Sequence, residues 1–297
     1  MSKHLLSGVG VALITPFNED MTIDFDGLGR LLEHCIDGGV DYFVVNGTTA
    51  ENPVLTAAEK QQVLNYVIEQ NNGRLPVVFG IGGNNTAAVV EELKAFDTAG
   101  VCAILSASPY YNKPTQEGIY QHYKALAEAS PLPLIVYNVP GRTSSNISAE
   151  TTLRLAADFE NIIAVKEASG NLDQTTQIIL GRPAEFAVLS GDDNLTYAML
   201  GLGADGVISV SGQGVPEIFC AMVDSHAAGD PETARDHHLS IYNLTNDLFV
   251  EGNPTGIKAL LAARGVCGPT VRLPLVEATA GLKATMAEHL DTLFTEE

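Results

Sequence analysis

Lys166 is the side chain of this sequence with the clearest potential for chemistry, because it lies in a short apolar run, from Ile162 to Ala168. Such a run, rich in β-branched residues, predicts a buried parallel strand. A buried ammonium is costly unless it is paired or loses its proton, and a neutral lysine amine attacks carbonyl carbons. The other seven lysines lie in expected helices, loops or termini. The alternative is a lysine at the strand end that reaches solvent or pairs with Glu167.

Hydroxyl and guanidinium groups follow the neighbouring apolar runs. Tyr137 ends the run before that of Lys166, and a phenol near an amine could move the protons that imine chemistry requires. Thr48 and Thr49 stand in a turn before a helix, where hydroxyl and N–H groups could hold a carboxylate. Arg142 follows a Pro-Gly turn and suits a bidentate carboxylate contact. Taken singly, a core tyrosine, a helix cap and a surface salt bridge remain the alternatives.

Other kinds of site find less support in the sequence. The segment from Gly80 to Gly83 resembles a dinucleotide fingerprint, but Asn85 takes the place of its last glycine. The seven histidines are His4, His34, His122, His226, His237, His238 and His289. They fall mainly on helical or terminal segments, so we expect neither a metal site nor a metal-dependent aldolase. Four widely spaced cysteines without a Cys-x-x-Cys pair argue against disulfides and cysteine zinc sites.

Eight short apolar runs, each followed by a turn and a helical pattern, must position these side chains. They are Val9–Ile14, Tyr42–Val45, Val77–Phe79, Cys102–Leu105, Leu134–Tyr137, Ile162–Val165, Ala187–Leu189 and Val207–Val210. Among the intervening helices we expect Ala57–Gln70, capped by Thr56 with Glu59, and Ala87–Ala99. A further helix starts at Ser148. Eight such units predict a TIM (β/α)8 barrel, and an open doubly wound sheet is the second choice.

The pattern changes after the eighth run. Pro231–Leu248, Thr255–Arg264 and Leu275–Leu293 predict helices without strands between them. We therefore expect a catalytic barrel over residues 1–229 and a C-terminal helical appendage over residues 230–297. In such a barrel the polar residues that follow the strands converge on one rim, where TIM-barrel active sites lie.

The bulk composition narrows the partners. The chain has 297 residues and a formal net charge of −20, with a pI of about 4.6. Such a field repels nucleic acid and anionic membranes, so we expect neither as a partner. No apolar stretch approaches the roughly 18 residues of a membrane span. The apolar stretch Leu5–Phe17 ends in the sequence Thr15-Pro16-Phe17 and continues with Asn18-Glu19-Asp20, with no small-residue cleavage site of a signal peptide, so we expect a cytoplasmic protein.

Five motifs, in order and over nearly the whole chain, closely resemble the dihydrodipicolinate synthase family. This family belongs to the pyruvate-dependent class I aldolases, as does N-acetylneuraminate lyase. The motifs are Gly47–Glu51, Ser108–Pro114, Tyr137–Thr143, Val165–Asn171 and Ser190–Asp193. The resemblance implies condensation of pyruvate with L-aspartate-4-semialdehyde, a committed step towards diaminopimelate and lysine. It implies no cofactor beyond a covalent imine, and a homotetramer built from tight dimers.

The resemblance also implies roles for single residues. Lys166 would form the Schiff base, and Tyr137, Thr48 and Tyr111 would relay protons, with Tyr111 crossing from a neighbouring subunit. Pyruvate would contact Thr49, Gly191 and Ile208, and Arg142 would hold the carboxylate of the semialdehyde. Asn84 and Tyr110 match a lysine-binding allosteric site.

Three positions depart from the family pattern. Ala50 replaces a glycine after the two threonines, which alters the turn slightly and leaves both hydroxyls in place. Ala88 stands where lysine-sensitive members carry a glutamate, and Ala57 where they carry a histidine. Without that carboxylate an effector ammonium loses its partner, so we expect weak or absent inhibition by lysine.

Two other functions remain open. A lyase for a sialic acid or a keto-deoxy sugar acid would share Lys166 and Tyr137 but use another aldehyde; Arg142 favours the semialdehyde, which carries a carboxylate. A barrel that only binds a keto acid would need no imine-forming lysine beside two tyrosines.

Overall fold

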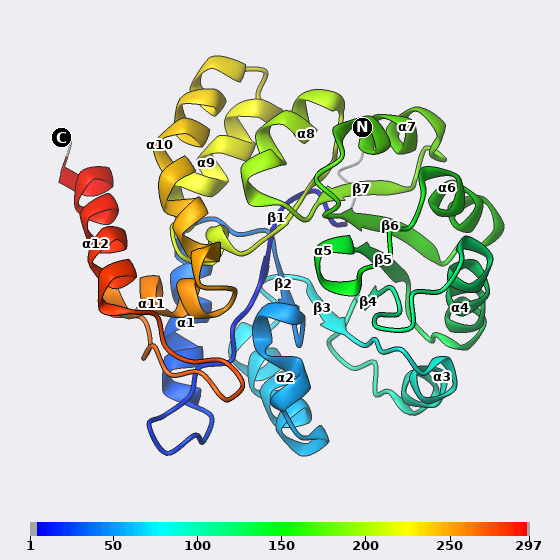
Figure 1. Cartoon of the computed structure of the whole chain (residues 1–297), viewed down its shortest axis with the longest axis horizontal. Coiled ribbons are helices and arrows are strands. Elements are labelled where there is room, and N and C mark those ends of the chain that lie inside the picture. Colours follow the sequence, from blue (N-terminus) through cyan, green and yellow to red (C-terminus); the bar gives the residue numbers. More distant parts are fainter. Residues whose placement is uncertain (1–4, 296–297) are drawn as a thin grey trace. The chain divides into compact units, whose positions relative to one another are not determined.

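A closed barrel of eight strands, in the order β1 to β8, forms the centre of the fold. The paired strands run parallel. The computed structural model describes residues 5–295, and Figure 1 shows the barrel strands with their helices. The expected TIM barrel is therefore confirmed. The described chain divides into two compact units: unit 1 contains the residues up to Ser7 and Pro76–Ile208, and unit 2 contains Gly8–Leu75 and the residues from Ser209 onwards.

Unit 1 carries most of the strands. Its strands are β3 (Val77–Gly80), β4 (Ala103–Ala107), β5 (Leu134–Asn138), β6 (Ile162–Glu167), β7 (Ala187–Ser190) and β8 (Gly206–Ser209), the last of which ends at the unit boundary. Its helices are α3 (Thr86–Ala95), α4 (Gln116–Ala129), α5 (Pro140–Thr143), α6 (Ala149–Asp158), α7 (Leu172–Gly181) and α8 (Thr196–Leu202), with the 3-10 turn η3 (Asp193–Leu195). Nearly all strand residues are buried, as expected for strands covered on both faces.

Unit 2 combines the first two strands with the C-terminal helices. Its elements are β1 (Gly8–Ala12), α1 (Phe25–Asp37), β2 (Tyr42–Val45), η1 (Thr48–Ala50), η2 (Asn52–Val54), α2 (Ala57–Asn71), η4 (Ser211–Gln213), α9 (Pro216–Ala227), α10 (Pro231–Val250), α11 (Thr255–Ala263) and α12 (Ala280–Thr295). Within this unit α10 packs against α9, α11 and α12. The expected domain boundary after residue 229 falls between α9 and α10, and that division stays a prediction.

Most helix boundaries agree with the sequence patterns, and two do not. Thr56 caps α2 through the expected reciprocal bonds with Glu59, and Ser148 caps α6 through Thr151. The helix expected over Ala87–Ala99 ends at Ala95, because Phe96 takes an extended backbone and stacks on Phe79. The helix expected from Leu275 begins only at Ala280.

Thr279 explains the late start of α12. Its hydroxyl accepts a hydrogen bond from the N–H of Leu282, and its own N–H and hydroxyl donate to the carboxylate of Glu251. This is the N-cap arrangement that starts a helix. The apolar spacing before Thr279 does not reveal it.

A buried ion pair ties α11 to the segment after β2. Lys258 Nζ lies 2.5 Å from Glu51 Oε1, and the two side chains are 0% and 1% exposed. Lys258 also donates to the carbonyl of Thr270, and the N–H of Arg272 donates to Glu51 Oε2. Burial lowers the pKa of Lys258, and the attraction of Glu51 opposes that shift. Sequence reasoning overlooked this second buried lysine.

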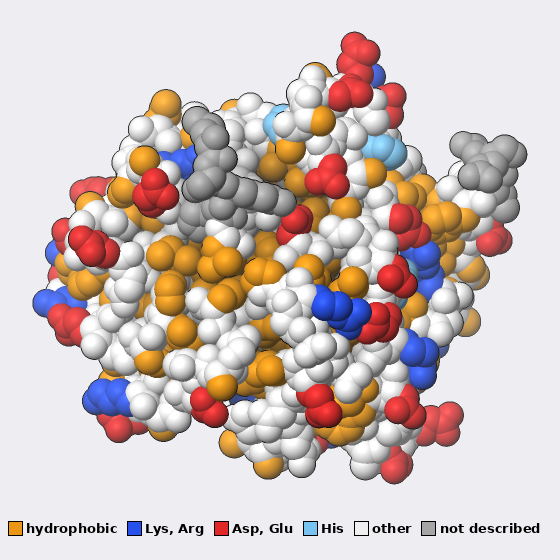
Figure 2. Space-filling model, turned by 180° about the vertical axis from the view of Figure 1, so that it is seen from behind, with side chains coloured by type: hydrophobic (Ala, Val, Ile, Leu, Met, Phe, Trp, Pro, Cys, Tyr) orange, Lys and Arg blue, Asp and Glu red, His pale blue; other side chains and the backbone are white. Residues whose placement is uncertain are grey.

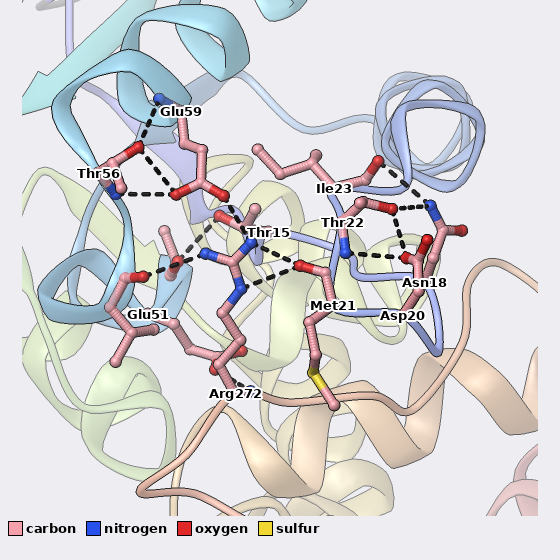
Figure 3. Close-up of polar contacts among 12 residues, drawn as sticks. Thr15, Asn18, Asp20, Met21, Thr22, Ile23, Glu51, Thr56, Glu59 and Arg272 are labelled. Carbon is pink, nitrogen blue, oxygen red and sulfur yellow. Dashed lines mark hydrogen bonds and ion pairs between the residues drawn. The ribbon is translucent and has the colours of Figure 1, made fainter.

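Arg272 reinforces the same junction, as Figure 3 shows. Its guanidinium donates to the carbonyls of Met21 and Val54 and to the carboxylate of Glu59. The side-chain hydrogen bond from Arg272 lowers the pKa of Glu59 to about 2. The segment around residues 270–272 is thus fastened to the chain between β2 and α2.

On the one face that Figure 2 shows, charged side chains are dispersed rather than gathered in one patch. On the face shown in Figure 2, acidic side chains are scattered among neutral and apolar atoms, and several lie next to a basic one. None of the helices in the described range is long and apolar enough to cross a membrane.

Replacing Lys258 by methionine should lower the free energy of unfolding by about 3–5 kcal/mol, because Glu51 would be left buried without its cation. The melting temperature should fall by roughly 10 °C, measured by thermal unfolding. The double variant Lys258→Met/Glu51→Gln should recover part of the loss. Lys283→Met, which removes an exposed pair with Glu277, is the matched control and should cost less than about 1 kcal/mol. A Lys258→Met protein as stable as that control would contradict this account.

Candidate active site

Lys166 and Tyr137 lie side by side on neighbouring strands of unit 1. The register of β5 and β6 pairs Tyr137 with Lys166 directly. Lys166 Nζ lies 4.3 Å from the centre of the tyrosine ring, and both residues are buried. The structure therefore brings together the amine and the phenol that the sequence singled out, with the nitrogen over the face of the ring.

Among the described residues no carboxylate pairs with the buried amine of Lys166. Successive side chains of a strand point to opposite faces, so Glu167 points away from Lys166. In the described part of the chain Lys166 forms no ion pair, and its one polar contact is the tyrosine ring. The alternative of a lysine neutralised by Glu167 is thus wrong. A lysine without a permanent salt bridge keeps its nitrogen available for a bond to a ligand.

Gly191, directly after β7, packs against the aliphatic stem of Lys166. A Cβ atom at this position would lie 3.0 Å from both Cγ and Cε of Lys166 and 2.7 Å from Cβ of Ala168. Its N–H donates to the carbonyl of Glu167. A glycine here lets the end of β7 approach the lysine, and any side chain would displace it.

A buried carboxylate lies behind the Lys166–Tyr137 pair. The Glu167 carboxylate accepts hydrogen bonds from Asn138 Nδ2 (2.9 and 3.1 Å), from Gln174 Nε2 (2.9 Å) and from the N–H of Ser169 (2.7 Å). Asn138 also bonds Asn146 and accepts from the N–H of Ile147. Sequence reasoning missed this network, although Asn138 and Glu167 directly follow the two candidate residues.

Arg142 and Tyr111 are exposed side chains of unit 1. Arg142 lies on the single-turn helix α5 rather than in the expected loop. Among the described residues no carboxylate pairs with it, so the surface salt bridge considered above is absent there. Tyr111 is 86% exposed and has a left-handed backbone (φ 70°). Both side chains are thus accessible to a ligand or to another chain.

The remaining candidates of unit 1 occupy two places. Ile208 is buried in β8. Asn84 and Tyr110 lie together, with Asn84 Nδ2 donating to the Tyr110 carbonyl at 3.5 Å. The structure thus joins the two candidate allosteric residues through a weak contact.

Thr48 and Thr49 lie in unit 2, on the turn η1 after β2. Thr48 is half-buried and Thr49 is buried. The Thr49 hydroxyl accepts a hydrogen bond of 2.9 Å from Asn253 Nδ2. The carbonyl of Ala50 accepts one from the buried hydroxyl of Thr15. Tertiary contacts therefore hold this turn, as well as the local capping that the sequence suggested.

Two of the described histidines contact other side chains in the fold. His122 bonds Thr86 through Nδ1, and burial lowers its pKa to about 4. His289 pairs with Asp247, and His4 lies outside the described residues. Within residues 5–295 no group of three histidine, cysteine or acidic side chains could hold a metal ion. Beside the candidate site, burial raises the pKa of Asp192.

Replacing Glu167 by glutamine should destabilise the protein by about 2 kcal/mol, because one oxygen becomes an NH2 group facing the donors of Asn138 and Gln174. Thermal unfolding measures the loss. The matched control is Glu92→Gln on the exposed surface of α3, which has no ion pair among the described residues and should change stability by less than about 0.5 kcal/mol. Equal stability of the two variants would show that the network contributes nothing.

Comparisons with known proteins agree with this arrangement. The sequence profile of the Dihydrodipicolinate synthetase family matches residues 5–293. A 4-hydroxy-tetrahydrodipicolinate synthase from Parabacteroides distasonis is 54% identical over 93% of this chain and 93% of its own. The dihydrodipicolinate synthase of Acinetobacter baumannii, solved with pyruvate, is 39% identical with a TM-score of 0.93, covering 97% of this chain and 99% of its own.

A second solved structure, of the enzyme from Cyanidioschyzon merolae with lysine bound, is 38% identical with a TM-score of 0.93. It covers 98% of this chain and 99% of its own. Since the profile match and these identities extend over nearly the full length, this chain belongs to the dihydrodipicolinate synthetase family.

Proposed function

We propose that this protein is a 4-hydroxy-tetrahydrodipicolinate synthase, which condenses pyruvate with L-aspartate-4-semialdehyde in the biosynthesis of diaminopimelate and lysine. The observation that carries the proposal is Lys166, a buried lysine that lies beside Tyr137 and has no carboxylate partner in residues 5–295, in a chain of this family. The synthase from Parabacteroides distasonis, at 54% identity, supports the same activity.

The chemistry begins at the Lys166 nitrogen. Its lone pair attacks the ketone carbon of pyruvate, and the resulting carbinolamine loses water to give an imine. The imine then loses a methyl proton to become an enamine, whose carbon attacks the aldehyde. The amine of the semialdehyde displaces the lysine, closing the ring and restoring Lys166.

Each of these steps moves a proton, and hydroxyl groups suit that task. The pairing of β5 with β6, which sets Tyr137 opposite Lys166, supports this role for Tyr137. By family resemblance we assign the remaining relay to Thr48 and to Tyr111, the latter from a neighbouring subunit. The strong exposure of Tyr111 in a single chain supports a role outside its own subunit.

Two carboxylates need partners in this reaction. We assign Thr49, with Gly191 and Ile208, to the pocket of pyruvate, which the relative from Acinetobacter baumannii binds. We assign Arg142 to the carboxylate of the semialdehyde, since its guanidinium is exposed and unpaired among the described residues. A lyase for sugar acids would not need the guanidinium of Arg142, and the comparisons do not favour such a lyase.

The proposal includes the expected setting of the enzyme. It uses small-molecule substrates, a covalent imine in place of a cofactor, and no nucleic acid or membrane. We further propose a cytoplasmic homotetramer built from tight dimers, which the family resemblance implies, with Tyr111 reaching a neighbouring subunit.

Incubation with pyruvate and borohydride should attach a reduced three-carbon adduct to Lys166, identified by peptide mass mapping. The other buried lysine, Lys258, is an internal control and should stay unmodified because it is ion-paired with Glu51. Lys166→Arg should abolish both the adduct and turnover, since a guanidinium forms no stable imine.

The same preparation identifies the acceptor. Aspartate-4-semialdehyde should be consumed in the presence of pyruvate, and sugar aldehydes should not. Absence of the Lys166 adduct would refute the proposal, and turnover of sugar aldehydes alone would favour the sialic acid lyase.

Lysine should inhibit this enzyme weakly or not at all. Ala57 and Ala88 lie in the first turns of α2 and α3, so neither position offers a charged partner to the effector. Activity measured against lysine concentration checks this, and the synthase from Cyanidioschyzon merolae, which binds lysine, serves as the comparison. Half-inhibition at submillimolar lysine would show the prediction to be wrong.

A further inference from the structure

The C-terminal region of unit 2 contacts Thr49, a residue that we propose binds pyruvate. Asn253 lies between α10 and α11, and its side-chain Nδ2 donates to Thr49 Oγ1 at 2.9 Å. Asn253 is 8% exposed and Thr49 is 3% exposed. A buried amide–hydroxyl hydrogen bond, shielded from water, fixes the geometry of both groups.

Three further bonds join the residues that follow Thr49 to the C-terminal region. Lys258, five residues after Asn253, pairs with Glu51, two residues after Thr49. The N–H of Arg272 also donates to Glu51, and its guanidinium donates to the carbonyl of Val54. Figure 3 shows Arg272 and Glu51 at this junction. The Asn253–Thr49 contact therefore lies beside an ion pair that joins α11 to the residue directly after the turn η1.

The direction of this bond determines what the Thr49 hydroxyl can do. A threonine hydroxyl has one proton to donate and two lone pairs that accept. Because Asn253 supplies the donor, one lone pair of Oγ1 is occupied and the proton of Thr49 must point to a different acceptor. The Thr49 hydroxyl is thus oriented to donate its proton in a further hydrogen bond, and a bound carboxylate requires such a donor.

The other end of the same amide also points to a function. Asn253 Oδ1 is buried and has no hydrogen-bond partner among the described residues. An unsatisfied buried carbonyl costs free energy, and a side chain selected for stability alone would avoid it. The presence of an asparagine at position 253 is explained by the hydrogen bond that its NH2 group donates to Thr49.

We propose that Asn253 is a positioning residue: by donating to Thr49 Oγ1 it orients the Thr49 hydroxyl as a donor to the carboxylate of the keto-acid substrate. This inference rests on the proposed function, in which Thr49 binds pyruvate. It assigns to the C-terminal helical region a part in substrate recognition as well as in stability.

Two variants of Asn253 test the direction of the bond. Asn253→Asp keeps the shape but at neutral pH can only accept, so the Thr49 proton should turn towards residue 253. Asn253→Leu keeps the approximate size and removes both polar groups. Each should raise the KM for pyruvate about tenfold, the loss expected for one hydrogen bond to a charged group. The kcat should change less than about twofold, because the contact exists equally in the ground and transition states.

Thr49→Val provides the readout that separates positioning from a structural role. If Asn253 acts through the Thr49 hydroxyl, then Asn253→Leu should raise the KM in the wild-type background and leave it unchanged in the Thr49→Val background. A merely structural asparagine would produce the same change in both backgrounds. Asn65→Asp, on the exposed face of α2, is the matched control and should leave the KM for pyruvate unchanged.

The outcomes distinguish this inference from the proposed function. An unchanged KM in Asn253→Asp, or equal effects of Asn253→Leu in both backgrounds, overturns the inference while the borohydride adduct on Lys166 still forms. Failure of the wild-type protein to form that adduct overturns both. Because Asn253→Asp preserves the shape of the side chain, its KM for pyruvate decides the question even if Asn253→Leu does not fold.

Discussion

The alternation of side chains along the parallel strands is the constraint on which the candidate site depends. It places Tyr137 and Lys166 on one side of β5 and β6, and Asn138 and Glu167 on the other. Slipping the two strands by one residue would separate both pairs at once. The hydrogen bonds of Asn138 to Glu167 therefore stabilise the strand register that sets Lys166 beside Tyr137. A buried carboxylate held by neutral donors stabilises this arrangement without neutralising Lys166.

The two buried lysines, Lys166 and Lys258, have different neighbours, and these neighbours determine what each amine can do. Lys258 lies against Glu51 and the carbonyl of Thr270, so each of these contacts stabilises its charge. Lys166 has an aromatic face and the backbone of a glycine beside it. In the first environment the nitrogen is occupied by the Glu51 carboxylate and the Thr270 carbonyl. The second leaves the nitrogen available for a carbonyl carbon.

The sequence predicted the barrel and the Lys166–Tyr137 pair because both follow from local patterns. Consecutive strands of a parallel barrel are neighbours, so residues at the ends of two successive apolar runs must meet. The contacts that it did not predict join distant segments. Glu51 and Lys258 are separated by 207 positions, and Thr49 and Asn253 by 204. One signal was present: α11 is mostly apolar, and a helix of that kind is buried together with any lysine it carries.

The net charge of −20 poses a physical problem for an enzyme whose proposed substrates carry carboxylates. Salt screens charges beyond about 8 Å at physiological ionic strength, so the overall field weakens and nearby groups decide binding. Several arginines of the described chain are engaged: Arg74, Arg154 and Arg264 each pair with a glutamate. Arg142 differs in having no such partner among the described residues. The oriented hydroxyl that we propose at Thr49 is a neutral donor, so it would bind a carboxylate without the desolvation cost of a buried cation.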